Sequence, residues 1–315
     1  MRAVVLAYSD VGTVGLQVLL ELGVEVPAVF THADDANEEI RFRSVAALAT
    51  AHGVPVFTDE RLDTPPWLTR LRGWAPEFLF SFYYRRMLPS AVLETASRGA
   101  LNLHGSLLPR YRGRCPTNWV LIHGERETGV TLHYMVAKPD AGDIVAQRRV
   151  PIADDDTALT LYRKQAAAAE VLLRDIVPRL DAGTAPRLPN DVAAGSYFGG
   201  RTPADGAIDW SADARTIFNL VRAVTHPYPG AFAAWRGRPL FVWQARVGGG
   251  DAAPPRAGEA HPCPGAVVAV DGEAIVVQTG GGTLRLTSVQ WGAEAEMSGG
   301  AWARAQGVTK GTVLA

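Results

Sequence analysis

The chain is poor in cysteine, in lysine and in net charge. Its 315 residues contain two cysteines, Cys115 and Cys263, whose spacing matches no zinc motif, and we expect both to be free thiols in a reducing compartment. Lysine occurs three times, and the formal net charge at pH 7 is −1. Because there is no basic excess, a broad nucleic-acid-binding surface is not expected.

Long hydrophobic runs are also missing. No apolar run approaches the roughly 18 residues that a membrane-spanning helix needs. The run from Ala3 to Tyr8 is too short for a signal peptide and is followed by Asp10, so it predicts a buried first strand. We therefore expect a cytoplasmic protein that is not inserted in a membrane. With 47% apolar residues, the chain is long enough to bury a sizeable core in one large domain or two smaller ones.

Several motifs of common enzyme sites are absent. The turn after the first predicted strand, residues 9–15, reads SDVGTVG and not GxGxxG, so NAD and FAD are not expected. The chain also has no Walker A motif, no HExxH and no GxSxG. Simple phosphotransferases, zinc peptidases and serine hydrolases are therefore not expected, and neither is a metal.

The first half of the chain alternates between two hydrophobic patterns. Short apolar runs predict strands, whereas apolar residues three or four apart predict helices. The predicted strands cover residues 3–7, 26–30, 54–57, 78–82 and 100–104, and the predicted helices cover 14–22 and 44–52, the second with Ser44 as N-cap. This alternation predicts an α/β domain with a parallel sheet, in which ligands bind beyond the carboxyl ends of the strands.

The remaining pattern divides the chain into two domains. Strands over 128–136 and 143–150 and a helix over 157–180 complete a predicted catalytic domain of residues 1–190, and turn formers predict a linker over 191–206. Beyond the linker, a helix over 212–224 precedes short strands at 231–235, 240–247, 266–270, 274–278 and 283–289. Short strands with glycine-rich turns predict a small barrel domain over 207–305, followed by a tail at 306–315.

Three polar residues form the candidate reaction centre. Asn102 and His104 lie two residues apart at the end of a predicted strand, so their side chains share a face. Asp140 follows in a stretch rich in turn formers. An amide N–H can stabilise negative charge on a carbonyl oxygen, an imidazole can carry a proton near neutral pH, and a carboxylate can raise the pKa of the imidazole. This set suits the attack of an amine on an activated carbonyl.

Each of these residues also has a structural interpretation. A histidine at a strand end often serves packing, Asn102 could stabilise a turn, and Asp140 before an Ala-Gly pair is typical of an Asx turn. Cys115, in the loop that follows His104, is an alternative nucleophile, although the amide and the imidazole suffice without it. The spacing alone leaves these alternatives open.

A longer pattern around these residues resembles a known family. The stretches NLH, SLLPRYRG, NW, TGVT and DAGDI are similar to the 10-formyltetrahydrofolate-dependent formyltransferases, which include methionyl-tRNA formyltransferase and the sugar N-formyltransferases. They stand at residues 102–104, 106–113, 118–119, 128–131 and 140–144. The resemblance implies a Rossmann-like catalytic domain and a C-terminal barrel of the OB type. It also implies that His104 carries the proton, Asn102 stabilises the transition state and Asp140 raises the pKa of His104.

Within this family the chain most resembles the formyltransferase part of the bifunctional UDP-4-amino-4-deoxy-L-arabinose enzyme, which implies a role in lipid A modification. The matching segments are AY at residues 7–8, FTH at 30–32, FSFYYR at 80–85, RTP at 201–203 and PGAF at 229–232. The resemblance implies that 10-formyltetrahydrofolate is a co-substrate. Its predicted contacts are Arg86, Met87, Leu88, Arg114, Val136, Ala137, Lys138, Pro139 and Asp140.

Two departures from that relative concern length and one side chain. The sequence ends at residue 315, so we expect the decarboxylase half of the bifunctional enzyme to be absent. Arg110 stands where lysine is usual before Tyr-Arg-Gly. The charge is kept, but arginine and lysine bind oxygen groups differently, so the difference affects fine substrate contacts rather than the reaction class.

Charge favours a small acceptor over tRNA. The tRNA contact of the methionyl-tRNA enzymes is a basic loop after the second strand, whereas residues 32–39 here read HADDANEE and would repel phosphates. From Ala204 onward, nine basic residues balance nine acidic ones. We therefore expect a nucleotide-linked amino sugar, UDP-4-amino-4-deoxy-L-arabinose, as acceptor. The alternatives are methionyl-tRNA, another small amine, and a folate- or nucleotide-binding module without catalysis.

Overall fold

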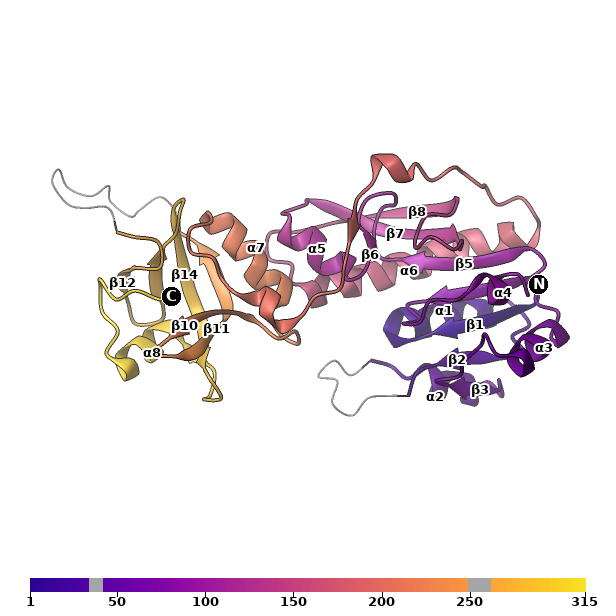
Figure 1. The fold of residues 1–315 in the computed structure, drawn as a ribbon, viewed down its shortest axis with the longest axis horizontal. Coiled ribbons are helices and arrows are strands. Elements are labelled where there is room, and N and C mark those ends of the chain that lie inside the picture. The colour runs from indigo at the N-terminus through magenta and orange to yellow at the C-terminus, as the bar shows by residue number, and fades with distance from the viewer. Residues whose placement is uncertain (34–41, 249–261) are drawn as a thin grey trace. The chain divides into compact units, whose positions relative to one another are not determined.

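The computed structural model describes residues 1–33, 42–248 and 262–315. The chain divides into two compact units. Figure 1 shows the fold coloured by residue number, from indigo at the N-terminus to yellow at the C-terminus. Unit 1 comprises Met1–Pro116, Arg126–Ile152 and Tyr162–Gly199, and unit 2 comprises Thr117–Glu125, Ala153–Leu161 and Gly200–Ala315. Two short segments of unit 2 therefore lie far before its main part in the sequence.

Unit 1 is built on a seven-stranded sheet with the order β3-β2-β1-β4-β5-β7-β8. The strands are β1 Ala3–Ala7, β2 Val29–Thr31, β3 Val56–Thr58, β4 Phe78–Phe82, β5 Gly99–His104, β7 Glu127–Tyr134 and β8 Ile144–Pro151. Neighbours among the first five strands in this order are parallel. Strand β7 is antiparallel to both β5 and β8. The predicted α/β fold with a mostly parallel sheet is confirmed.

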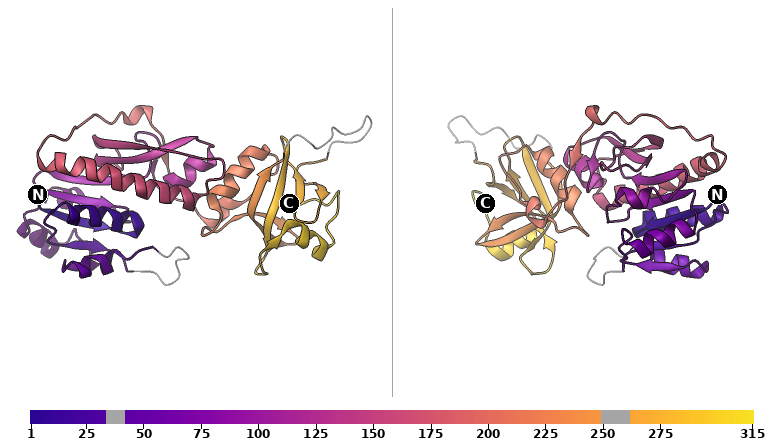
Figure 2. Two further views of the ribbon diagram at one scale, coloured as in Figure 1. Left: turned by 180° about the vertical axis from the view of Figure 1, so that it is seen from behind. Right: turned by 45° about the vertical axis from the view of Figure 1, so that its right-hand side comes forward.

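Helices cover both faces of this sheet. They are α1 Ser9–Glu21, α2 Val45–Ala51, α3 Pro65–Gly73, α4 Ser90–Leu93 and α6 Ala158–Asp181, whereas α5 Pro116–Ile122 belongs almost wholly to unit 2. The predicted N-cap of α2 is confirmed, because the Ser44 hydroxyl accepts a hydrogen bond from the Ala47 N–H. The long helix α6 lies along one face (Figure 2), where the Tyr162 hydroxyl donates to the Ser9 hydroxyl at 3.0 Å. Of the helices in the described segments, none is long and apolar enough to cross a membrane.

The core of unit 1 explains the continuous apolar runs of the strands. Every residue of β1 and of β4 is buried, as expected for strands covered on both faces. On one face, Val4, Leu6 and Leu79 belong to a buried cluster that also contains Leu71 of α3 and Val92 of α4. Because β1 and β4 are covered on both faces, nearly all of their side chains are apolar. The continuous apolar runs in the sequence therefore predict the bounds of these two strands correctly.

Helix α1 begins at Ser9, five residues before the start of the helix predicted over 14–22. The prediction began too late because Gly12 and Gly15, which lie inside the helix, usually mark a turn. A Cβ atom at Gly15 would collide with the Phe82 ring of β4, and one at Gly12 would lie 3.1 Å from the Ala7 side chain. The glycines therefore allow the helix to pack closely on the sheet and do not mark a turn.

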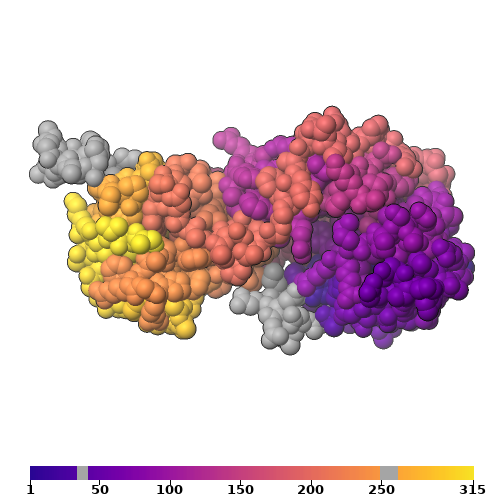
Figure 3. Space-filling model, viewed as in Figure 1, coloured from indigo at the N-terminus to yellow at the C-terminus, as the bar shows by residue number. Residues whose placement is uncertain are grey.

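Unit 2 contains an antiparallel sheet with the order β10-β11-β14-β13-β12, and β15 pairs with β14. Its elements are α7 Ala214–Val224, β10 Ala231–Trp235, β11 Arg238–Val247, β12 Val267–Val270, β13 Ile275–Gln278, β14 Thr283–Trp291, β15 Met297–Ser298 and α8 Gly299–Gln306. Residues coloured orange to yellow form one compact body in the space-filling view (Figure 3). The predicted C-terminal β domain is confirmed as an antiparallel sheet, while its assignment to the OB type stays a prediction.

Backbone hydrogen bonds from the C-terminal residues reach both edge strands of this sheet. On the β12 side, the Val267 N–H donates to the Thr312 carbonyl at 2.7 Å, and the Leu314 N–H donates to the Gly265 carbonyl at 2.9 Å. On the β10 side, the Ala315 N–H donates to the Ala234 carbonyl at 3.0 Å. The segment predicted as a tail thus runs between the two edges.

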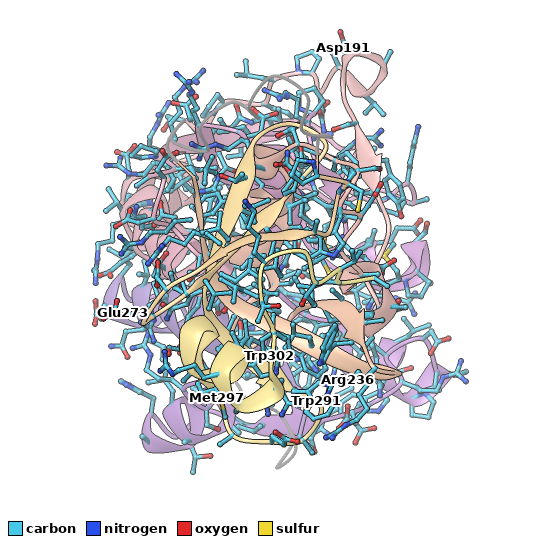
Figure 4. The ribbon with its side chains drawn as sticks, turned by 90° about the vertical axis from the view of Figure 1, so that its left-hand side faces the viewer. Asp191, Arg236, Glu273, Trp291, Met297 and Trp302 are labelled. Atoms are coloured by element: carbon cyan, nitrogen blue, oxygen red, sulfur yellow. The ribbon has the colours of Figure 1, made fainter. Side chains whose placement is uncertain are left out.

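Three tryptophans of unit 2 contact one another, and Figure 4 labels two of them, Trp291 and Trp302. The rings of Trp235 and Trp302 meet edge to face with centroids 5.9 Å apart, and the Trp291 indole N–H donates to the Trp235 carbonyl. The guanidinium carbons of Arg236 and Arg238 lie over the Trp235 and Trp291 rings at 5.0 and 4.1 Å. Aromatic packing therefore stabilises the connection between β10 and β11.

Candidate active site

Strands β5 and β7 position three of the site residues. Asn102 is opposite His133, and His104 is opposite Thr131, in the antiparallel register of these strands. His104 and His133 are both buried. Because Asn102 and His104 are two residues apart on β5, their side chains emerge on one face of the sheet, at the carboxyl end of the strand.

Asp140 lies in the connection between β7 and β8, and its backbone is held from several sides. Its φ of +49° lies in the left-handed region, which a non-glycine residue keeps only where its surroundings require it. The Gly113 N–H donates to Asp140 Oδ2 at 2.8 Å, and Asn190 Nδ2 donates to the carbonyls of Asp140 and Gly142 at 3.0 and 3.1 Å. Residues distant in sequence thus fix the carboxylate in place.

The structure brings the three predicted catalytic residues together. His104 Nδ1 lies 3.6 Å from Asp140 Oδ1. Asn102 joins them through a fourth residue, because its Nδ2 atom is 3.2 Å from His133 Nε2, which is itself 3.5 Å from Asp140 Oδ1. Two imidazoles therefore share one carboxylate, and the amide of Asn102 contacts one of them.

Hydrogen-bond partners assign the ring nitrogens of the two histidines. His104 Nε2 is 2.8 Å from the Tyr111 carbonyl, and His133 Nδ1 is 2.8 Å from the Tyr134 carbonyl. A carbonyl only accepts, so both nitrogens carry hydrogen. His133 Nε2 contacts both the Asn102 amide and Asp140 Oδ1, and His104 Nδ1, on the side of Asp140, is the nitrogen that can gain or lose a proton.

Burial and charge act in opposite directions on the pKa values here. Burial lowers the pKa of His104, and this outweighs the effects of Asp140 and of the Tyr111 carbonyl, which raise it. Burial alone would raise the pKa of Asp140, but His104, His133 and the Gly113 N–H bring it down to about 2. Asp140 thus acts to raise the pKa of His104, yet the net pKa of His104 lies below its ordinary value because the ring is buried.

The loop after β5 is held by a two-stranded ribbon of β6 Arg112–Gly113 and β9 Tyr197–Phe198. The Tyr111 ring stacks on the Phe198 ring with centroids 5.2 Å apart. Gly113 has a φ of +98°, and a Cβ atom there would collide with the Phe198 carbonyl oxygen. Part of the stretch predicted as a linker, residues 191–206, therefore supports the site loop.

The predicted folate contacts differ in exposure. Met87 is 64% exposed and Val136 is 44% exposed, so both apolar side chains are accessible, as are the side chains of Ala137 and Lys138. Leu88 is buried in the core cluster, where its side chain is not accessible to a ligand. These residues, with Pro139, belong to unit 1.

The two predicted folate-binding arginines are both exposed. The Arg86 guanidinium donates to the carbonyls of Asp59 and Glu60 at 2.8 and 3.1 Å, so its orientation is set by the segment after β3. The Arg114 N–H donates to the Phe198 carbonyl, which places this residue at the end of the β6–β9 ribbon. The next residue, Cys115, is an exposed free thiol, and so is Cys263, as the sequence predicts.

Sequence reasoning missed His133 and Asn190. His133 alternates with apolar residues along β7, and only the pairing of β7 with β5 sets it opposite Asn102. Asn190 lies fifty residues after Asp140, in a stretch of turn formers. In the described ranges, no cluster of three or more histidine, cysteine, aspartate or glutamate side chains could hold a metal ion.

Comparison with known families agrees with this arrangement. Residues 13–177 match the family model for formyl transferase, and residues 201–307 match the model for the formyl transferase C-terminal domain. The chain belongs to the formyl transferase family. The predicted enzyme class, a formyltransferase, is confirmed.

Solved structures share the fold of this formyltransferase at low sequence identity. The N-formyltransferase from Helicobacter canadensis, in complex with folinic acid and dTDP-3-aminofucose, has 18% identity and a TM-score of 0.67, with 91% of this chain and 99% of that chain covered. WlaRD, a sugar 3N-formyl transferase in the presence of dTDP and 5-N-formyl-THF, has 16% identity and a TM-score of 0.67, with 94% and 99% covered. HypX from Aquifex aeolicus, in complex with tetrahydrofolic acid, has 20% identity and a TM-score of 0.63; the match covers 98% of this chain but only 47% of HypX.

Proposed function

We propose that this formyltransferase moves a formyl group from 10-formyltetrahydrofolate to the primary amine of a nucleotide-linked amino sugar. The observation that carries the proposal is the contact between His104 and Asp140, 3.6 Å apart, with Asn102 joined to the same carboxylate through His133. The folate derivatives in two similar structures, with dTDP-3-aminofucose in one and dTDP in the other, support it. We propose UDP-4-amino-4-deoxy-L-arabinose as the first acceptor, because stretches such as FSFYYR at residues 80–85 and RTP at 201–203 resemble the formyltransferase part of the bifunctional enzyme for that sugar.

In the proposed reaction, the acceptor nitrogen forms a bond to the formyl carbon while the bond from that carbon to N10 of the folate breaks. The amine loses a proton and N10 gains one. His104 suits this exchange because its lowered pKa leaves Nδ1 unprotonated at neutral pH, and the charge of Asp140 stabilises the ring once it is protonated. The same nitrogen can then return the proton to the leaving group.

Asn102 would stabilise the negative charge that develops on the formyl oxygen. One hydrogen of its Nδ2 atom points to His133 Nε2, which leaves the other for a substrate oxygen. An oxyanion donor of this kind is typically worth about 2.7–4 kcal/mol in the transition state. The exposed side chains of Met87 and Val136 would pack against the folate ring, and Arg86 and Arg114 would bind its polar groups.

Methionyl-tRNA is the alternative acceptor within the family. The acidic stretch Asp34–Glu39 opposes it on charge, although this stretch lies outside the described residues. The balance of nine basic and nine acidic residues from Ala204 onward gives no basic platform for an acceptor stem either. A non-catalytic binding module is disfavoured because simple binding does not require a buried imidazole against an ionised carboxylate.

An acceptor screen tests the proposal. Purified protein is incubated with 10-formyltetrahydrofolate and one acceptor at a time: UDP-4-amino-4-deoxy-L-arabinose, a dTDP-amino sugar, methionyl-tRNA or hydroxyornithine. We expect the highest kcat/KM with a nucleotide amino sugar, measured as release of tetrahydrofolate. Preference for methionyl-tRNA would overturn the acceptor assignment, and folate binding without transfer to any acceptor would favour the binding module.

A further inference from the structure

Arg112, in β6, is a buried cation for which the described residues provide no hydrogen-bond acceptor. The residue is 7% exposed, and its Nε atom has no hydrogen-bond partner. Across residues 1–33, 42–248 and 262–315, no hydrogen bond or ion pair of its guanidinium is found; the guanidinium carbon lies 5.8 Å from the centroid of the Tyr197 ring. A cation–π contact at that distance replaces only a small part of the lost hydration.

Arg222, a second buried arginine in the described segments, has hydrogen-bond acceptors that Arg112 lacks. Arg222 is also 7% exposed, but its Nε atom donates to Asn219 Oδ1 at 3.0 Å and its Nη1 atom donates to the Ala153 carbonyl at 3.0 Å. Burying a charge without such acceptors is costly, and native proteins keep such groups where something outside the chain compensates them. Arg112 therefore indicates an acceptor that comes with a ligand.

The backbone around Arg112 connects it to the reaction centre. On one edge of β6, the Arg112 N–H donates to the Ser196 carbonyl at 3.0 Å. On the opposite edge, the Tyr111 carbonyl faces His104 Nε2 and the Gly113 N–H donates to Asp140. The residues on either side of Arg112 thus hold the two groups proposed to move the proton, so the position of Arg112 in the chain is tied to the reaction centre.

We propose that Arg112 binds an anionic oxygen group, a phosphate or a carboxylate, carried by one of the substrates. This inference rests on the proposed function, because the diphosphate of a nucleotide sugar and the glutamate carboxylates of a folate are the two groups of this chemistry that the reaction would bring. A guanidinium matches both, since its planar fork donates two parallel hydrogen bonds to paired oxygens.

Calorimetric titration of Arg112 variants with three probes tests the assignment. The probes are inorganic pyrophosphate, UDP and 5-formyltetrahydrofolate, which need no turnover, so the result is independent of the acceptor screen. Arg112→Met removes the charge and keeps most of the apolar stem. Arg148→Met, at an exposed position of β8, is the matched control for the same loss of charge.

We expect Arg112→Met to weaken at least one probe by about tenfold or more, since hydrogen bonds to charged groups contribute that much to affinity. Weaker binding of pyrophosphate and UDP would identify a phosphate site. Weaker binding of 5-formyltetrahydrofolate alone would identify a carboxylate site. The ligand-free variant should melt no lower than the wild type, because an uncompensated buried charge has been removed. Wild-type affinity for all three probes would overturn the proposal.

Arg112→Lys covers the case in which the methionine variant does not fold. It keeps the positive charge but loses the planar fork, so at least one probe should bind several-fold more weakly than to the wild type. Equal affinities of Arg112→Lys and the wild type for every probe would also overturn the role of the guanidinium. If an Arg112 variant loses probe affinity while no acceptor is formylated, the anion site stands and the proposed reaction fails.

Discussion

His104 and Asp140 have complementary charge states at neutral pH. Asp140, with a pKa of about 2, is ionised, whereas burial keeps His104 neutral. A neutral imidazole beside a carboxylate can accept a proton and is then stabilised as a cation. The proposed chemistry therefore depends on the contact between His104 and Asp140 and not on either residue alone.

Replacing the imidazole should stop the reaction. In His104→Ala, formyl transfer to the best acceptor should fall by about 10²–10⁴-fold, the usual contribution of a positioned acid–base group. Far-UV circular dichroism should remain that of the wild type, since the change removes one side chain at the end of β5 and no backbone hydrogen bond of the sheet. Turnover close to wild type in a folded His104→Ala protein would contradict the role of His104.

Removing the carboxylate should move the pH profile in a defined direction. Asp140 raises the pKa of His104, so Asp140→Asn should lower that pKa further. The acidic limb of kcat/KM against pH, which rises as His104 loses its proton, should then shift to lower pH while the maximal rate falls. An unmoved limb would show that Asp140 has no electrostatic effect on His104.

His133 should act by positioning Asn102. His133→Phe removes the acceptor that holds the Asn102 amide at 3.2 Å, so kcat should fall by about tenfold with little change in KM, the cost of one such hydrogen bond. His133→Gln offers a carbonyl acceptor on a side chain of similar length and should recover part of the rate. Equal rates for both variants would assign His133 to packing alone.

Residue types and spacing predicted three of the four side chains in this cluster. Asn102, His104 and Asp140 stand in continuous motifs, and motifs are visible in a sequence. The contribution of His133 depends on the register of β7 against β5, a property of strand pairing that local sequence does not encode. The dominance of burial in the pKa of His104 also required the folded environment.

At the scale of elements, the short ribbon β6–β9 holds two residues of the reaction centre in place. Its two-residue strands lie far apart in sequence, and one edge of β6 contacts both His104 and Asp140. Because Gly113 has a positive φ and faces the Phe198 carbonyl, the ribbon tolerates no side chain there. The geometry of the reaction centre is therefore coupled to residues after α6.

Gly113→Ala should disturb this coupling. The added methyl group would push β6 from β9 and adopt a strained backbone, so the free energy of unfolding should fall by about 1–3 kcal/mol and formyl transfer should fall with it. Gly73→Ala is the matched control, because no atom lies within 4 Å of the added group and no positive φ is involved. Denaturant titration of both variants measures the difference; equal stabilities would contradict the close approach.

Elements with one strong hydrophobic pattern were predicted best. The buried strands β1 and β4 and the long helix α6 lie where their patterns indicate. Helices α3, α5 and α8 were not predicted, because they begin at Pro65, Pro116 and Gly299, residues that usually mark breaks. Proline is favourable in the first turn of a helix, so the sequence signal was present but ambiguous.

At the scale of the whole molecule, the two units are interleaved in sequence. Residues 117–125 and 153–161 belong to unit 2, although its main part begins at Gly200. Asn118 Nδ2 donates to the Ala223 carbonyl at 2.7 Å, and Arg222 Nη1 donates to the Ala153 carbonyl at 3.0 Å. The family model for the C-terminal domain, residues 201–307, contains neither segment.

A fragment of residues 200–315 should therefore fold poorly on its own. Without Asn118 and Ala153, buried acceptors and donors of α7 lose their partners, which costs more than losing an exposed contact. We expect a broad thermal transition for the fragment and a cooperative one for the full chain, measured by circular dichroism. A sharp transition of the fragment at the temperature of the full chain would show that these segments are dispensable.

The bonds from Thr312, Leu314 and Ala315 to the outer strands of the C-terminal sheet have a consequence for self-association. A strand edge with unpaired N–H and C=O groups can template another chain and start aggregation. Here the backbone of residues 312–315 covers part of the β12 edge and part of the β10 edge. We therefore expect residues 312–315 to limit edge-to-edge association of this sheet, a role separate from formyl transfer.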